Sequence, residues 1–309
     1  MRSRLTHSFG GMRRYMQMSR VDVFIYVEGR DLDPDIYSRV CGSVCLDAQR
    51  DYEIVIADRI TGAAGGKEIL TQFFEFLSHN GALLDKSQPN TKLAMFYLDK
   101  DVDDVLGKAR RSPHIVYTEY YCLENYLFVY GNLLSSLATA GSIDLRLISG
   151  RIPDPKAWRD RVTNSWRDWV ALCLLAGKLS LPSIAGYRLA TSPINNPLDG
   201  PTDVTQLHRY IAQMESNSHL THGAFQSKVR SAYRLVNAVY ARGIYDKIFK
   251  GKWYFALAIR ELELAAGSHP YNQNRATDRL VGSLIASTDF EGAWAEHFKK
   301  PLRTALAQF

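Results

Sequence analysis

Short apolar runs alternate with segments of helical periodicity along the first 128 residues of the chain. Each run is rich in β-branched and aromatic residues, and nearly continuous runs of this kind are typical of strands buried in a parallel sheet. The strands are predicted at residues 21–27, 52–57, 93–98 and 114–118. Helices are predicted after them at residues 36–40, 67–77 and 123–127. Strands that alternate with helices predict βαβ units and an α/β fold.

The strand patterns stop near residue 128, and the rest of the chain is predicted to be mainly helical. The expected helices are residues 133–137, 156–175, 203–215, 224–249 and 253–265. A long loop is expected over residues 180–201, which contain four prolines. The first twenty residues hold five arginines and no acid, so we expect a basic tail there. The predicted organisation is therefore a tail at 1–20, an α/β domain at 21–128 and a helical domain at 129–309.

The composition indicates the class of protein but does not identify a function. Apolar residues make up 46% of the 309 residues and charged residues 23%, which is typical of a globular chain. No apolar run approaches the roughly 20 residues that a membrane-spanning helix needs, so no membrane association is expected. The four cysteines contain no C-x-x-C pair, which argues against a structural zinc site or a disulfide scaffold. We expect a cytoplasmic protein.

Positive charge is concentrated in the second half of the chain. Residues 1–150 hold 17 Lys and Arg against 19 Asp and Glu, whereas residues 151–309 hold 21 against 13. A half with net charge +8 suits a polyanion such as nucleic acid, or it serves only solubility.

Acidic residues stand where the predicted strands end. Glu28, Asp58 and Asp99 close three strands, Asp101 follows Asp99 after one residue, and Glu124 opens the helix after the fourth strand. Sites in open parallel sheets form at the carboxyl ends of the strands. Carboxylates gathered there repel one another unless a cation lies among them, and oxygen ligands suit Mg²⁺ or Mn²⁺. Taken singly, each acid is better explained as a helix cap or a turn residue than as a metal ligand, and it is the combination that favours a metal site.

Three short elements resemble a known family. Val27-Glu28-Gly29, then Tyr97-Leu98-Asp99-Lys100-Asp101, resembles the TOPRIM domain of topoisomerases, primases and OLD-family nucleases. The later Leu123-Glu124-Asn125-Tyr126-Leu127 is similar to the E-N-Y-L element of stand-alone OLD-like TOPRIM proteins from bacterial anti-phage defence loci. The resemblance covers about residues 21–128, with a weaker Gly251-Lys252 element in the helical part. It implies a TOPRIM-type parallel sheet flanked by helices.

The resemblance also implies roles for individual residues. Glu28 would bind metal and assist proton transfer, Asp99 and Asp101 would be metal ligands, and Glu124 would complete a second metal site. The implied cofactor is Mg²⁺ or Mn²⁺, as two ions. The segment after Glu28-Gly29 is one residue longer than in relatives, which leaves open whether Asp31 or Asp33 takes the family position.

The function that the resemblance implies is nucleic-acid cleavage. The chain would be a Mg²⁺-dependent endonuclease, a toxic effector of abortive infection that cuts host tRNA in preference to DNA. An ABC-type ATPase partner would hold it inactive, and homodimer formation is an option after release. The alternative is a catalytically weak TOPRIM-like subunit that binds and regulates an ATPase complex.

The helical half contains a basic segment interleaved with aromatic residues. Residues 233–260 hold six Lys and Arg and seven aromatics. Most of the rings at helical spacing are expected in the core, and we expect Tyr245 and Trp253 to stack on unpaired bases. Gly251 permits close backbone approach, so Lys252 could reach the scissile phosphate; a solvated turn lysine explains it equally well. Residues 62–67 lack the spacing of a phosphate-binding loop, so ATP hydrolysis by this chain is not expected.

Overall fold

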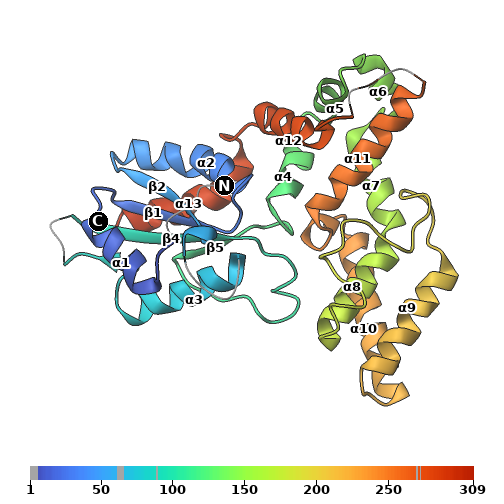
Figure 1. Ribbon diagram of the computed structural model, residues 1–309, viewed down its shortest axis with the longest axis horizontal. Coiled ribbons are helices and arrows are strands. Elements are labelled where there is room, and N and C mark those ends of the chain that lie inside the picture. The colour runs from blue at the N-terminus through green and yellow to red at the C-terminus, as the bar shows by residue number, and fades with distance from the viewer. Residues whose placement is uncertain (1–5, 61–65, 88–89, 269–270, 272) are drawn as a thin grey trace. The chain divides into compact units, whose positions relative to one another are not determined.

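The computed structural model describes residues 6–60, 66–87, 90–268, 271 and 273–309 (Figure 1). The chain divides into two compact units, which are described separately. The sheet unit consists of Met1–Lys100, Ala109–Glu119 and Asp289–Phe309. The helical unit consists of Asp101–Lys108 and Tyr120–Thr288.

A five-stranded sheet forms the centre of the sheet unit. Its strands are β1 (Val23–Val27), β2 (Tyr52–Ile56), β3 (Leu84–Asp85), β4 (Lys92–Leu98) and β5 (Ile115–Tyr117). The order is β2-β1-β4-β3, with β5 also pairing with β4. All pairings are parallel except the short β3–β4 pair. The four predicted strands and the α/β class are confirmed, while β3 is too short to show a pattern of its own.

Helices pack on both faces of this sheet. They are α1 (Phe9–Met18), α2 (Asp33–Asp47), α3 (Gly66–His79) and α13 (Glu296–Leu306). On one face Tyr26 stacks on Phe96, and Phe73 of α3 meets both rings. On the other face Tyr97 contacts Tyr37 of α2, and both rings lie against Phe298 of α13. The alternation of side chains along β1 and β4 therefore fills two separate cores.

The N-terminal segment differs from the expected basic tail. Ser8 caps α1 by accepting the N–H of Gly11, and Met12 and Met16 are buried in the same core cluster as Phe24. The two methionines lie one turn apart on α1, and the arginine content of this segment concealed a buried helical face. Residues 1–5 lie outside the described residues.

The C-terminal segment also differs from the expected division at residue 128. Helix α13 contacts α2 and β4, so residues 289–309 belong to the sheet unit instead of the helical domain. The Tyr97 hydroxyl donates to the carbonyl oxygen of Phe298 at 3.1 Å. In the other direction, residues 101–108 and 120–128 belong to the helical unit. Contacts distant in sequence decide both assignments.

The helical unit is all-helical within its described residues. Its helices are α4 (Leu123–Tyr130), α5 (Leu133–Gly141), α6 (Leu145–Arg151), α7 (Pro155–Ser165), α8 (Arg167–Leu179), α9 (Val204–Asn217), α10 (His222–Ala241), α11 (Gly251–Ala266) and α12 (Ala276–Ser287). The helix expected at 156–175 is two helices that meet at Trp166, and the one expected at 224–249 ends at Ala241. The proline-rich segment 180–201 is a loop, as predicted. Of the helices described, none has the length and apolar character needed to cross a membrane.

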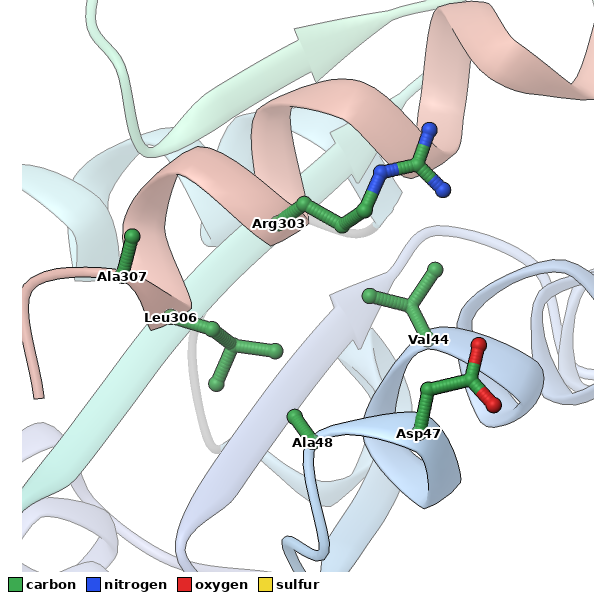
Figure 2. A pocket seen from close by; sticks show the side chains of 6 residues that line it. All are labelled: Val44, Asp47, Ala48, Arg303, Leu306 and Ala307. Atoms are coloured by element: carbon green, nitrogen blue, oxygen red, sulfur yellow. The ribbon is translucent and has the colours of Figure 1, made fainter.

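A pocket of about 370 Å³ opens between the C-terminal turns of α2 and α13 (Figure 2). Val44, Ala48, Leu306 and Ala307 make its wall mainly apolar, with Asp47 and Arg303 at the rim as the charged side chains. The residues that line it include none of the predicted site residues, so the pocket was not foreseen from the sequence.

Candidate functional site

The first two predicted acids meet at the carboxyl ends of adjacent parallel strands. Glu28 directly follows β1 and Asp99 directly follows β4, and the register of these strands pairs Val27 with Tyr97. Glu28 Oε1 accepts the backbone N–H of Asp99 at 2.7 Å. Glu28 and Asp99 therefore lie at the carboxyl ends of neighbouring parallel strands, as the sequence predicted.

The turn after Glu28 is held by Asp33, the first residue of α2. The backbone N–H of Gly29 donates to Asp33 Oδ2 at 2.7 Å. A Cβ on Gly29 would lie 2.8 Å from Asp33 Oδ1, so a side chain at this position would collide with the carboxylate. Asp31 instead has a 94% exposed side chain 3.7 Å from Arg30. Of the two residues that the sequence left open, Asp33 is the one tied to the Glu28 turn.

The residues that follow β2 and β5 make other interactions than the Glu28–Asp99 pair. Asp58 lies in the 3₁₀ turn η1 (Ala57–Arg59) after β2, and its side chain is half exposed, 4.0 Å from Arg30. After β5, the Thr118 hydroxyl accepts the N–H of Lys100 at 2.8 Å. The residue between the two aspartates of the D-x-D element is thus bonded to the segment that follows β5.

Asp101 begins the helical unit and has an uncommon backbone conformation. Its φ of +52° is in the left-handed region, which Asp tolerates better than most residues that carry a side chain. Its N–H donates to the carbonyl oxygen of Tyr121 at 2.8 Å. The N–H of Tyr121 in turn donates to the carbonyl oxygen of Asp246 at 2.8 Å. Asp101 is therefore connected by backbone bonds to a segment near the start of α11.

The E-N-Y-L and Gly-Lys elements meet inside the helical unit. Lys252 Nζ lies 3.5 Å from Glu124 Oε1, and the glutamate side chain is 11% exposed. Gly251, the first residue of α11, packs directly on the backbone where α4 begins. A Cβ there would lie 2.5 Å from the nitrogen of Asn125 and 2.9 Å from the carbonyl carbon of Glu124. The predicted close approach at Gly251 exists, and its target is α4.

Three buried polar residues that were not among the predicted site residues stabilise this junction. Asn125 Nδ2 donates to Asp246 Oδ1 at 2.9 Å and to the Phe249 carbonyl oxygen at 3.0 Å. Its Oδ1 accepts the N–H of Cys122 at 3.2 Å. The Tyr254 hydroxyl donates to the same Asp246 oxygen at 2.9 Å. We call Asn125, Asp246 and Tyr254 the junction network; the only signal for it in the sequence is the asparagine within the E-N-Y-L element.

Burial shifts the pKa of two charged groups at this junction. Asp246 is buried, and loss of hydration raises the pKa of its carboxyl group although Asn125 and Tyr254 partly oppose the shift. Lys250 donates to the Tyr187 carbonyl oxygen at 2.5 Å, and burial together with the charge of Lys252 lowers its pKa. Lys250 is therefore less exposed to a ligand than its sequence position suggested.

The prediction that Tyr245 and Trp253 stack on unpaired bases is wrong. Trp253 is fully buried and Tyr245 is 5% exposed. Trp253 Nε1 donates to the Leu189 carbonyl oxygen at 2.8 Å, and the Tyr245 hydroxyl donates to Asp160 Oδ1 at 2.5 Å. Both rings therefore have core positions with satisfied polar atoms, and neither presents a face on which a base could stack.

The four predicted metal ligands are divided between the units: Glu28 and Asp99 in the sheet unit, Asp101 and Glu124 in the helical unit. Their oxygen atoms are the donors that Mg²⁺ and Mn²⁺ prefer. The cysteines offer no alternative, because all four are buried and burial raises the pKa of Cys41 and Cys45 to about 12. Among the residues that the structure describes, no three His, Cys, Asp or Glu side chains form a group that could hold a metal ion.

Comparison with known proteins adds no family assignment. A scan against protein-family models found no match, and a search of the curated proteins found none either. The TOPRIM resemblance is carried by the Glu28-Gly29, Asp99-Lys100-Asp101 and Glu124-Asn125-Tyr126-Leu127 elements of the sequence.

Proposed function

We propose that this chain is a metal-dependent nuclease of the OLD-like TOPRIM type that cleaves phosphodiester bonds in nucleic acid. The observation that supports the proposal best is the bond between the Glu28 carboxylate and the backbone of Asp99 at the ends of β1 and β4. Two acids from elements far apart in the sequence are adjacent at the sheet edge where open parallel sheets carry their sites.

Each residue has a definite task in the proposed reaction. Glu28 and Asp99 of the sheet unit are the carboxylates that would bind Mg²⁺ or Mn²⁺, and by the TOPRIM resemblance Asp101 and Glu124 would be the further ligands of two ions. When bound, such ions neutralise charge that develops on a phosphodiester and on its leaving oxygen. Glu28 would accept a proton from the attacking water. Lys252, which is 62% exposed, would donate to a phosphate oxygen.

The resemblance suggests a cellular role within the same proposal. The chain is similar to AriB, the TOPRIM effector of the PARIS anti-phage defence system. By that likeness it would act in the cytoplasm on host tRNA, be restrained by an ABC-type ATPase (AriA-like) and dimerise when released. Expression of the chain alone should then inhibit translation, and an adjacent ATPase gene product should co-purify with it. A harmless monomer without such a partner would contradict the defence role.

The test of the nuclease is a pair of isosteric substitutions. Glu28→Gln keeps an oxygen that can accept the Asp99 N–H, and Asp99→Asn keeps the backbone donor, so both variants should fold. We expect each to cleave tRNA, single-stranded RNA or DNA about 1,000-fold more slowly than wild type in single-turnover assays with Mg²⁺. Asp35→Asn is the matched control, because Asp35 is an exposed acid of α2 paired with Arg39. Full activity in both site variants would refute the assignment.

A second candidate is a TOPRIM-like binding or regulatory subunit without strong catalysis. Wild-type protein that binds nucleic acid equally in Mg²⁺ and in EDTA and never cleaves it would support this second function. Cleavage that requires Mg²⁺ would exclude it.

A further inference from the structure

Helix α10 has an unusual charge composition. Residues 216–245, which include the whole helix, contain no Asp or Glu. Thr221 caps the helix by accepting the N–H of Ala224, and Phe225, Ala232 and Val236 are buried along its inner face. This face packs on α8, beside which α10 lies in Figure 1. The apolar side of the helix is therefore already used within the helical unit.

The outer side of α10 carries positive charge without ion pairs. Lys228, Arg230 and Arg234 are exposed, as is Arg242 at the C-cap. None of these four side chains forms an ion pair or a hydrogen bond with another residue in the described part of the chain. Three cations of other helices do have acidic partners: Lys156 with Asp160, Arg260 with Glu263, and Arg39 with Asp35. We call Lys228, Arg230, Arg234 and Arg242 the α10 basic face.

Two acids lie near α10 without pairing with the cations of the α10 basic face. Asp168 accepts the Thr202 hydroxyl at 3.0 Å and also interacts with the Tyr233 hydroxyl of α10. Glu215 lies 2.6 Å from His222 Nδ1 at the start of the helix. Lys178 of α8 adds a further cation, since its ammonium group donates to Ser231 Oγ at 3.3 Å. Burial and the nearby charge of Lys228 together lower the pKa of Lys178. Lys178 therefore adds one cation of α8 beside the α10 basic face.

We propose that the α10 basic face binds the phosphate backbone of a nucleic acid. This proposal deepens the proposed function, because it identifies where the substrate of that nuclease is held. At about 1.5 Å per residue, Lys228 and Arg242 lie about 21 Å apart along the helix, a length that meets about six phosphates of one strand. Contacts of this kind are independent of base sequence.

The composition of the face favours nucleic acid over other acidic partners. The exposed positions between the cations are small or polar: Ser227, Ser231, Asn237 and Ala238. A protein partner would need aromatic or aliphatic anchors at the centre of its interface, and this face has none of them exposed. A membrane surface would need a free apolar helix face, whereas that of α10 is buried against α8.

The experiment measures binding without cleavage. Fluorescence anisotropy with labelled tRNA, in EDTA and at several salt concentrations, would compare wild type with Lys228→Gln/Arg230→Gln/Arg234→Gln. We expect the triple variant to bind at least about 10-fold more weakly near 0.1 M salt, with a salt slope smaller by up to about 2 units. Arg146→Gln/Lys156→Gln/Arg260→Gln removes the same charge from exposed cations that have acidic partners, and it should bind like wild type.

A charge-retaining variant separates folding from binding. Arg230→Lys/Arg234→Lys should keep wild-type affinity, because phosphate attraction depends on the charge. Equal weakening of both glutamine triples, or an unchanged salt slope in the α10 triple, would overturn the proposal, as would wild-type protein that binds no tRNA. Binding that depends on the α10 basic face without any cleavage in Mg²⁺ would instead refute the nuclease and leave the α10 surface in place.

Discussion

Glu28 and Asp99 are adjacent because parallel strands end at one edge of a sheet, whereas Glu124 and Lys252 are adjacent because buried side chains tie two helix starts together. The first pair needs only the strand register and one bond to a backbone N–H. The second pair depends on a glycine with no room for a side chain and on the junction network. The strand-end arrangement should therefore tolerate substitutions that the helix junction does not.

The largest expected effect on stability is at Gly251. Gly251→Ala would place a Cβ 2.5 Å from the nitrogen of Asn125, and that backbone cannot move without disturbing α4. We expect the free energy of unfolding to fall by about 2–3 kcal/mol, which urea denaturation would measure. Gly282→Ala in α12 is the matched control, because nothing lies within 4 Å of its added Cβ. The free energy of unfolding of Gly282→Ala should rise by up to about 1 kcal/mol. Equal effects at both sites would show that α4 and α11 are not tightly packed at Gly251.

Next in size is the loss of the buried acceptor at Asp246. Asp246→Leu would leave the Tyr254 hydroxyl without its hydrogen-bond acceptor. It would also remove one of the two acceptors that Asn125 Nδ2 has. We expect a loss of about 2 kcal/mol at neutral pH, and a much smaller loss for Asp246→Asn, which keeps the accepting oxygen. Equal melting temperatures for the two variants would contradict this role of the carboxylate.

The same residue predicts a pH dependence. The pKa of Asp246 is raised in the folded state, so between its unfolded and folded pKa values the native protein binds more protons. Its contribution to stability is therefore greatest below the unfolded pKa and falls as pH rises through the folded pKa. The stability of Asp246→Asn relative to wild type should increase from about pH 4 towards neutrality. A constant difference across that range would show that folding does not raise the pKa of Asp246.

The smallest expected effect is at the sheet edge. Asp33→Ala removes the acceptor of the Gly29 N–H, but water can reach this half-buried turn. We expect a loss of about 1 kcal/mol. Asp35→Ala, in the same first turn of α2, removes an exposed ion pair and should cost about 0.4 kcal/mol. A larger loss at Asp33 than at Gly251 would reverse the contrast between the two regions.

The sequence was sufficient for the features that local patterns encode. Four strands, their parallel arrangement and the acids that close β1 and β4 follow from apolar runs and from the geometry of parallel sheets. Helix boundaries were less accurate where one periodic stretch contains two helices, as at Trp166. The periodicity of residues 156–175 continues through this break because both helices bury apolar faces.

Only the tertiary structure decided which distant segments meet. Helix α13 returns to β4, Met12 and Met16 enter the core, and Trp253 is enclosed by its own unit. The partners of Asn125 and Gly251 also come from segments far away in the chain. A periodic pattern indicates that a side chain is buried. It does not identify the distant residue against which that side chain packs. For the same reason, only the tertiary structure shows that the cations of the α10 basic face have no acidic partner among the described residues.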